Sequence, residues 1–446
     1  MLRRVLIALP IFALAAAAQS RAVVLISIDG LRPDAVTQAD KHGLKIPNLR
    51  QFLKAGAYAQ TVRGVLPTVT YPSHTTIVTG VWPAKHGIPN NVVFDPLVKN
   101  QSGWYWYAED IKAPTLWDAA AKAGIPTGSV SWPVTVGAPG IHFNVPEIWR
   151  AWTPDDAKLN RAVATPPSLM QEFGPVLGPY RYDQDAPIPT DWIRTRYAER
   201  MIREKKARFV TVHLAGLDHV EHETGQFSPE ANAVLEATDE MVGVLAKAIR
   251  EAAPASAVVI VSDHGFAKID RELNLKVAFV KAGLITPNPK KPGAVSDWKA
   301  EAWAASASYF VVIKDPRDTA TRNEVEALLK EIAADPANGV ARVLDRKAIA
   351  ALGGTPAAEF AVDMKSGFSV GTALEGALVR AIKPGGTHGY SPMNPDMRAT
   401  FLISGSGIRA GVDLGDIDMR SIAPTIAKFL GVPLPSADLP ALNIFR

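Results

Sequence analysis

Three continuous apolar runs, each ending in a polar turn, set the strongest limit on how this chain can fold. They lie at residues 22–30 (AVVLISIDG), 207–216 (ARFVTVHLAG) and 256–265 (SAVVIVSDHG). Their β-branched residues do not alternate with polar ones, which is typical of strands buried on both faces of a parallel sheet. Helical patterns at 113–124 and 230–252 lie between or beside them. This alternation predicts a doubly wound α/β fold with a mostly parallel sheet flanked by helices.

The pattern of predicted elements changes after about residue 288. A loop, a strand (ASYFVVIKDP) and an amphipathic helix (TATRNEVEALLKEIAADP) follow one another there. The chain then returns through a strand expected at 398–404. We therefore predict a catalytic α/β domain made of residues 19–296 and 384–446, interrupted by a small α+β cap at 297–383. The cap is expected to shape access to the site.

The first 18 residues have the pattern of a secretory signal peptide, with Arg3 and Arg4, an apolar run, and the small residues Ala16 and Ala18. The apolar run is shorter than the roughly 20 residues that span a bilayer, so no transmembrane segment is expected after its removal. The predicted location is periplasmic or extracellular. The chain has no cysteine, so a metal would have to bind to His, Asp or Glu.

The net charge of the chain does not indicate a macromolecular partner. Removing Arg3 and Arg4 lowers the formal net charge from +4 to +2, which does not favour a nucleic-acid-binding surface. The expected partner is a small molecule, and the chain could be a monomer or a homodimer.

Acidic and imidazole side chains gather at the predicted carboxyl ends of the strands, where open α/β sheets bind ligands. In LDHVEH, Asp218 and His222 are four residues apart, so one helical turn would place them on one face. His388, in a glycine-rich loop, would complete a set of three ligands. A second set is Asp29, Asp263 and His264. Such His and Asp sets suit zinc, with manganese or iron as other occupants.

Each of these six residues has a simpler explanation when taken alone, because an Asp at a strand end is commonly a helix cap or a turn former. Taken together at successive strand ends, they favour a paired metal site. His219 and Glu221 lie on other faces of the same helical turn and are expected to be solvated or to support the ligands.

Five motifs occur in a fixed order: ISIDGLRPD, PTVTYPSHTTIVTGVWPAKHGI, LDHVEHETG, VSDHGF and GTHGYSP. In this order they resemble the nucleotide pyrophosphatase/phosphodiesterase family of the alkaline phosphatase superfamily. The resemblance implies two Zn²⁺ ions per chain, with other divalent metals possible. It assigns Asp218, His222 and His388 to the first ion. It assigns Asp29, Asp263, His264 and the oxygen of the nucleophile to the second.

The resemblance also selects one hydroxyl. The family places its nucleophilic threonine just before an aromatic-Pro step, which maps onto Thr70 in TVTYPSH. Metal coordination would activate this hydroxyl without a general base, and hydrolysis would pass through a phosphothreonine intermediate. The neighbouring hydroxyls, such as Thr75 and Thr79, are expected to cap a helix, and the helix N-terminus after Pro72 is expected to bind a phosphoryl oxygen.

Four residues are expected to contact the substrate: Tyr71, Ser73, Asn91 and His213. Ser73 stands where typical members of the family have an asparagine that holds a phosphoryl oxygen. His213 stands where nucleotide-cleaving members have a tyrosine. Tyr71 could stack on a base or other flat leaving group, or it could anchor a proline-flanked turn.

The predicted function is a metal-dependent phosphodiesterase or pyrophosphatase acting on nucleotide-like or related phosphodiesters. A phosphate monoesterase on the same scaffold would need fixed cations for a dianionic group, and residues 128–140 contain no Lys or Arg. Arg32 or the cap could supply one. A sulfatase is disfavoured because its Cys/Ser-x-Pro-x-Arg pattern is missing. An exported metal-binding protein without catalytic activity is the remaining alternative.

Overall fold

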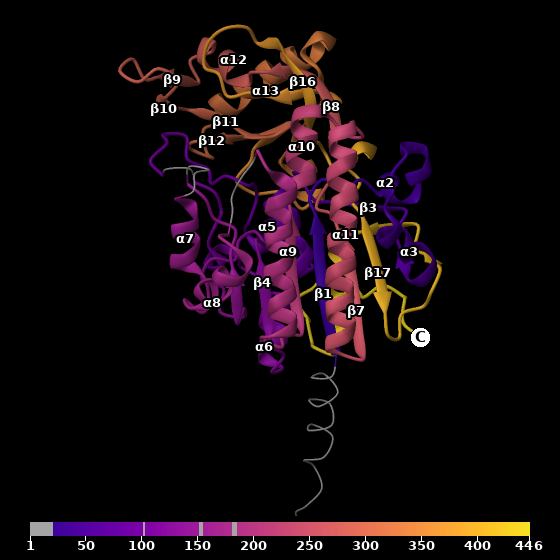
Figure 1. Ribbon diagram of the computed structural model, residues 1–446. Coiled ribbons are helices and arrows are strands. Elements are labelled where there is room, and N and C mark those ends of the chain that lie inside the picture. The colour runs from indigo at the N-terminus through magenta and orange to yellow at the C-terminus, as the bar shows by residue number, and fades with distance from the viewer. Residues whose placement is uncertain (1–20, 101–102, 151–154, 181–184) are drawn as a thin grey trace, which may run out of the picture.

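An eight-stranded sheet forms the centre of the larger domain, with the strand order β18-β2-β17-β7-β1-β6-β4-β5. The computed structural model describes residues 21–100, 103–150, 155–180 and 185–446 (Figure 1). The strands β7, β1, β6, β4 and β5 are parallel, whereas β17 is antiparallel to both of its neighbours. Their bounds are β1 Arg21–Ile28, β2 Ala57–Tyr58, β4 Thr127–Val130, β5 Phe143–Val145, β6 Phe209–Leu214, β7 Ala255–Val261, β17 Phe401–Gly405 and β18 Val412–Asp413.

The central strand β1 shows why the apolar runs form this sheet. Val24 and Ile26 pack against one layer of the protein, and Val23 and Leu25 pack against the opposite layer. Both faces of the strand are therefore buried, as the absence of polar alternation predicts. The three predicted strands are direct neighbours in the sheet, in the order β7-β1-β6, which confirms the doubly wound α/β fold.

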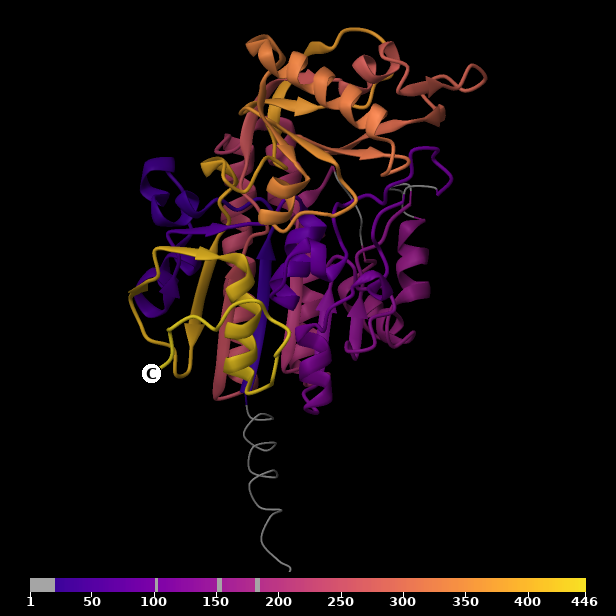
Figure 2. The ribbon, with the colours of Figure 1, turned by 180° about the vertical axis from the view of Figure 1, so that it is seen from behind.

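Helices cover both faces of the sheet, and Figures 1 and 2 show the two sides. On one side lie α3 (Pro47–Ala55), α9 (Pro187–Arg203) and α11 (Pro229–Ala252). On the other side lie α4 (Thr70–Thr79), α6 (Leu116–Lys122) and α15 (Ile422–Leu430). The remaining helices and short strands of this domain are α2 Pro33–Thr37, α5 Pro83–His86, α7 Asp156–Val163, α8 Leu169–Leu177, α10 Gly216–Thr224, β3 Thr61–Arg63 and β19 Asp416–Asp418.

A second region lies at one end of the main sheet (Figure 1). It contains the antiparallel sheet β11-β12-β14-β13 and the three-stranded sheet β15-β8-β16. Its strands are β8 Ala267–Leu273, β9 Ile285–Pro287, β10 Val295–Trp298, β11 Ala300–Ala305, β12 Ser308–Ile313, β13 Val340–Asp345, β14 Phe360–Met364, β15 Gly367–Val370 and β16 Val379–Thr387. Its helices are α12 Leu275–Lys281, α13 Thr319–Ala334 and α14 Arg346–Ala351.

The apolar residues of this inserted region form a core of their own, which runs along the chain from Ala267 to Met397. β8 and α12 belong to that core, although their sequence precedes the expected cap. The limits 297 and 383 stay a prediction, and the packing favours a larger insertion that begins at β8.

The last long strand is shifted from its expected position. A strand was expected at 398–404, whereas β17 spans Phe401–Gly405. Ala399 instead forms an isolated bridge with Val62, so the chain crosses to another partner before it joins the main sheet.

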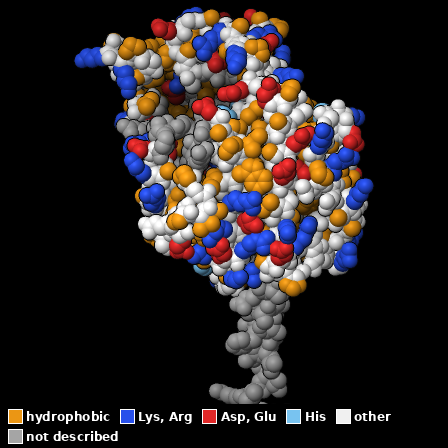
Figure 3. All heavy atoms as spheres, viewed as in Figure 1, with side chains coloured by type: hydrophobic (Ala, Val, Ile, Leu, Met, Phe, Trp, Pro, Cys, Tyr) orange, Lys and Arg blue, Asp and Glu red, His pale blue; other side chains and the backbone are white. Residues whose placement is uncertain are grey.

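The described residues contain no helix that is both long and apolar enough to cross a membrane. The predicted signal peptide, residues 1–18, lies outside the described part of the chain. On the face shown in Figure 3, Lys and Arg side chains are interspersed with Asp and Glu rather than gathered in one patch.

Candidate metal and substrate site

The six predicted ligands converge at the carboxyl ends of neighbouring strands. Asp29 directly follows β1, Asp263 and His264 follow β7, and α10 follows β6. Within the described residues they form two groups of three. In each group, the three ligand atoms lie within 4.8 Å of one another. The first cluster is Asp218, His222 and His388, and the second cluster is Asp29, Asp263 and His264.

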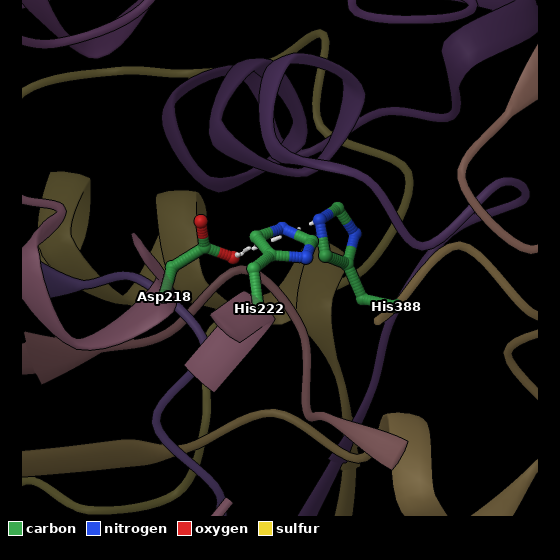
Figure 4. Close-up of side chains that lie close together, drawn as sticks. All are labelled: Asp218, His222 and His388. Carbon is green, nitrogen blue, oxygen red and sulfur yellow. Dashed lines mark ion pairs between the residues drawn. The ribbon is translucent and has the colours of Figure 1, made fainter. Parts of the chain in front are cut away.

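The first cluster joins α10 to the loop after β16 (Figure 4). Asp218 and His222 are one turn apart on α10, and Asp218 Oδ1 lies 3.5 Å from His222 Nε2. The same oxygen lies 3.7 Å from His388 Nε2. All three side chains therefore point toward one place, as the spacing in LDHVEH predicts.

Backbone carbonyls fix both imidazoles of the first cluster. His222 Nδ1 lies 3.0 Å from the carbonyl oxygen of Gly386, and His388 Nδ1 lies 3.0 Å from that of Thr68. Because a carbonyl oxygen can only accept, each Nδ1 carries the proton and each Nε2 keeps its lone pair for a metal. Burial and the neighbouring His264 and His222 also hold the pKa of His388 well below its usual range. His388 is therefore neutral and could bind a metal through Nε2.

Two glycines let β16 pass close to α10. A Cβ atom on Gly385 would lie 2.3 Å from the carbonyl oxygen of His222. One on Gly386 would lie 2.5 Å from the carbonyl oxygen of Glu221. Real Cβ atoms do not approach this closely, so the GG pair before His388 is what allows this strand to reach the first cluster.

The second cluster is completely buried. His264 Nε2 lies 3.0 Å from Asp263 Oδ2 and 3.3 Å from Asp29 Oδ1. None of these three atoms makes a well-aligned hydrogen bond to a described residue. The backbone N–H of Gly30 donates to the other oxygen of Asp263 at 3.2 Å. Each aspartate thus has one oxygen left to face the cluster.

Charge and geometry together fit a divalent cation. Burial raises the pKa of Asp29 well above its usual range, and Asp218 and Asp263 raise it further. Burial lowers the pKa of His264, but Asp263, Asp29 and Asp218 together raise it by more, to about 9. A bound cation would compensate the buried negative charge and replace this proton. Imidazole nitrogens and carboxylate oxygens without sulfur are the donor set that zinc accepts.

The two clusters are in direct contact with each other. The rings of His264 and His388 are stacked, with centroids 3.6 Å apart and an interplanar angle of 7°. One ligand of each cluster is therefore held by the other, and the two groups form one continuous site.

Thr70 lies at this site and is the first residue of α4. A cavity of about 320 Å³ opens beside it, and its wall is shared by Asp29, Thr70, Asp218 and His222. Acidic and histidine side chains are visible together just below the inserted region in Figure 3. The predicted nucleophile and ligands of both clusters thus face one cavity.

The helix that carries Thr70 begins earlier than expected. α4 starts at Thr70 itself, and the backbone N–H of Ser73 already donates to Val69 at 3.2 Å. The expected anion site after Pro72 is therefore not formed. Thr75 and Thr79 do not cap the helix, because their hydroxyls donate to carbonyls one turn earlier, as threonines inside helices commonly do.

Tyr71 and Ser73 are both buried, but only Tyr71 forms part of the cavity wall. The side chain of Tyr71 is fully buried, and its hydroxyl donates to Glu147 at 3.0 Å. This fits an anchor, and its ring also packs edge-on against Trp104 at 5.2 Å. The hydroxyl of Ser73 is buried, and Ser73 does not line the cavity. The reason is the early start of α4, which turns Ser73 toward the interior.

Asn91 lies beside the nucleophile. Its side-chain oxygen accepts the backbone N–H of Tyr71 at 2.8 Å. This hydrogen bond assigns the oxygen, so the NH₂ group of Asn91 is the donor that it can offer elsewhere. Asn91 is partly exposed, unlike Ser73.

His213 does not present a free edge to a substrate. Its Nε2 lies 2.9 Å from Asp29 Oδ2, and its Nδ1 lies 2.7 Å from Glu147 Oε2. The ring is almost completely buried, although it forms part of the cavity wall. Both nitrogens are engaged with carboxylates, which differs from the expected substrate contact.

Three charged residues of the cavity wall, Glu147, Asp191 and Arg194, belong to none of the five motifs. Glu147 follows β5, and Arg194 lies on α9, where it pairs with Asp191 at 2.9 Å. Asp191 also accepts the backbone N–H of Gly216, at the start of α10, at 2.8 Å. Arg32, a candidate cation for a dianionic substrate, instead pairs with Asp34 and Asp396.

The sequence places the chain in a known family. The sequence profile of the type I phosphodiesterase/nucleotide pyrophosphatase family matches residues 23–391. This chain belongs to that family, which confirms the resemblance inferred from the five motifs.

Individual relatives are distant and larger. Human ectonucleotide pyrophosphatase/phosphodiesterase family member 1 is 25% identical over 252 residues, which are 54% of this chain and 23% of that protein. The bis(5'-adenosyl)-triphosphatase of Xenopus laevis is 34% identical over 116 residues, which are 25% of this chain and 24% of that protein. These matches cover about a quarter of each relative.

The fold is also found in solved structures. An inactive variant of murine ectonucleotide pyrophosphatase/phosphodiesterase 5, in complex with AMP, superposes with a TM-score of 0.64 and 17% identity. The match covers 95% of this chain and 97% of that one. The human counterpart gives a TM-score of 0.64 and 18% identity, with coverages of 94% and 96%.

Proposed function

We propose that this protein is a metal-dependent phosphodiesterase that cleaves nucleotide-like or related phosphodiesters through a phosphothreonine intermediate. The observation that carries the proposal is the shared cavity, whose wall contains Thr70 together with ligands of both clusters. Family membership supports the reaction class. The AMP bound by the murine structural neighbour and the adenosyl substrate named for the Xenopus relative support a nucleotide-like ligand.

In this proposal Thr70 is the nucleophile. Its hydroxyl oxygen attacks phosphorus, and the bond to the leaving alcohol breaks as the bond to the threonine forms. The proton lost by Thr70 ends on the leaving oxygen. Water then attacks phosphorus, the bond between phosphorus and the threonine oxygen breaks, a proton from the water restores the hydroxyl, and the phosphate monoester is released. Two divalent cations, when bound, would supply the positive charge that activates Thr70 and stabilises the oxygens of the transferring group.

The ligand sets proposed for these ions are the two clusters, with Thr70 facing the second one. The chain would contribute the Nε2 atoms of three histidines, with His264 giving up its proton on binding, and one inward-facing oxygen from each of three aspartates. We take zinc as the metal to test first, because this donor set suits it.

The aromatic part of the cavity supports a flat leaving group or base. Trp104 and Trp149 line the cavity, and their rings pack edge-on at 4.7 Å. Tyr71 also lines the cavity but is fully buried, whereas Trp104 is only partly buried, so Trp104 is the better candidate for stacking. Asn91 is the proposed donor to a phosphoryl oxygen, in the place that the resemblance gives to Ser73.

Arg194 gives the monoesterase alternative a specific basis, because it is a cation in the cavity wall. Its charge is already balanced by Asp191 at 2.9 Å, which favours a singly charged diester over a dianionic monoester. We further propose that the chain is exported, on the basis of its predicted signal peptide.

The test compares kcat/KM of the zinc-loaded protein on a nitrophenyl phosphodiester and on the matching monoester, with a chelated sample as control. We expect a chelator-sensitive preference for the diester. The variant Thr70→Ala should keep its zinc and lose turnover by at least about 1,000-fold, as losses of catalytic nucleophiles do. Turnover at the wild-type rate would refute the assignment of the nucleophile, and a preference for the monoester would favour the alternative.

A further inference from the structure

A chain of three hydrogen bonds runs from the first turn of α4 to the second cluster. The hydroxyl of Tyr71 donates to Glu147 Oε1 at 3.0 Å. The other oxygen of Glu147 lies 2.7 Å from His213 Nδ1, and His213 Nε2 lies 2.9 Å from Asp29 Oδ2. All four side chains are at least nine-tenths buried. Water therefore competes little for these contacts, which strengthens each of them.

The topology explains why these residues meet. His213 pairs with Ser27 in the parallel register of β6 and β1, and Asp29 lies just beyond Ser27. Glu147 comes from the segment after β5, at the same edge of the sheet. The four residues thus come from four parts of the chain, and none of their contacts is local in sequence.

The chain of contacts decides which oxygen of Asp29 faces the cluster. Oδ2 is held by His213, whereas Oδ1 lies 3.3 Å from His264 Nε2 and makes no hydrogen bond to a described residue. A rotation of the carboxylate would break the contact with His213. The imidazole therefore sets the orientation in which Asp29 meets its partners.

The hydrogen-bond partners of His213 agree with this role. Its nitrogens face only acceptors, namely Asp29, Glu147 and the carbonyl oxygen of Ser131 at 3.0 Å. An imidazole that donates from both nitrogens is a rigid link between two carboxylates.

We propose that His213, held by Glu147 and Tyr71, is a positioning residue that presents Asp29 Oδ1 to a metal ion in the second cluster. The ion itself rests on the proposed function, whereas the three contacts do not. The proposal ties the ligand Asp29 to Tyr71, the residue next to the nucleophile, so one buried connection would keep the metal and Thr70 in register.

The test is a zinc titration of metal-stripped protein against a chromophoric chelator, together with kcat and KM. In His213→Phe we expect one of two zinc sites to weaken by about 10–100-fold, the usual loss when the partner of a ligand is removed. kcat should fall with little change in KM, because Asp29 rather than the substrate is misplaced. Glu147→Gln should have a smaller effect, and Tyr71→Phe the smallest.

Two further variants separate positioning from a general loss of structure. His213→Gln retains one donor for Asp29 and should recover part of the zinc affinity. His86→Phe removes another fully buried imidazole, which bonds to Thr76 at 3.0 Å and lies outside both clusters. It should lower stability without changing zinc affinity.

The outcomes are distinct. Unchanged affinity of both sites in a folded His213→Phe protein would overturn the proposal, and so would an equal loss in His86→Phe, or a wild-type protein that binds no zinc. If the wild type binds two zinc ions, His213→Phe weakens one of them, and no phosphodiester is cleaved, then the positioning role stands and the proposed function fails.

Discussion

The two ligand clusters are built from the same kinds of side chain, but they differ in access to water. In the second cluster the side chains of Asp263 and His264 are 0% exposed, whereas in the first cluster the side chain of His222 is 39% exposed. The second cluster sits at the ends of two central strands, and the first lies on a helix and a loop. The difference teaches that one site is part of the core, while the other can exchange ligands or metal with solvent.

The largest expected effect comes from breaking the buried cluster. Asp263→Asn should remove one of two zinc ions and lower kcat/KM by more than the roughly 100-fold seen when only a supporting residue is lost. His222→Asn in the exposed cluster should cause a smaller loss. Excess zinc should restore much of the activity of His222→Asn and little of that of Asp263→Asn. Equal rescue of both variants would contradict the comparison.

A substitution outside the ligands should affect the exposed cluster alone. Gly386→Ala would push β16 away from α10 and weaken the contact between Gly386 and His222 Nδ1. We expect one zinc site to weaken by about 10-fold and the protein to lose about 1–3 kcal/mol of stability from overpacking.

Gly174→Ala is the matched control for this change, because an added Cβ there meets no neighbour within 4 Å. It should leave zinc affinity unchanged. If Gly386→Ala also retained both affinities, the close approach of β16 would not matter for the first cluster.

The smallest effect concerns the metal-free protein. The raised pKa of Asp29 means that ionisation of this residue opposes folding. Its contribution to stability is therefore present below the unfolded pKa of about 3.9 and is lost as pH rises through the folded pKa. Asp29→Asn cannot ionise, so its stability relative to the wild type should increase over that range.

Chemical denaturation of metal-stripped proteins at several pH values would measure this difference. Asp218→Asn, which removes a carboxylate from the partly exposed cluster, is the comparison. If the metal-free wild type and Asp29→Asn had the same free energy of unfolding at every pH, ionisation of Asp29 would not oppose folding.

The sequence predicts those parts of the molecule that depend on local patterns. Asp218 and His222 are brought together by one helical turn, and Asp29, Asp263 and His264 by the ends of adjacent parallel strands. These positions follow from spacing and strand type alone, and so does the α/β fold.

The contacts that depend on packing could not be predicted in this way. Glu147 and Arg194 belong to no recognisable motif, and tertiary structure alone brings them to the cavity. The burial of Tyr71 depends on Trp104, which lies far along the chain. The start of α4 at Thr70 also escaped prediction, because no side chain caps that helix.

The inserted region is attached to the sheet domain directly beside the two ligand clusters. β8 begins at Ala267, shortly after His264, and β16 ends at Thr387, directly before His388. These two strand ends pair with each other, and the two imidazoles are stacked. A mechanical force that pulled the inserted region from the body would therefore load one ligand of each cluster. Bound metal would cross-link the inserted region to the sheet domain at this point. Its loss should therefore make the attachment of the whole region more flexible.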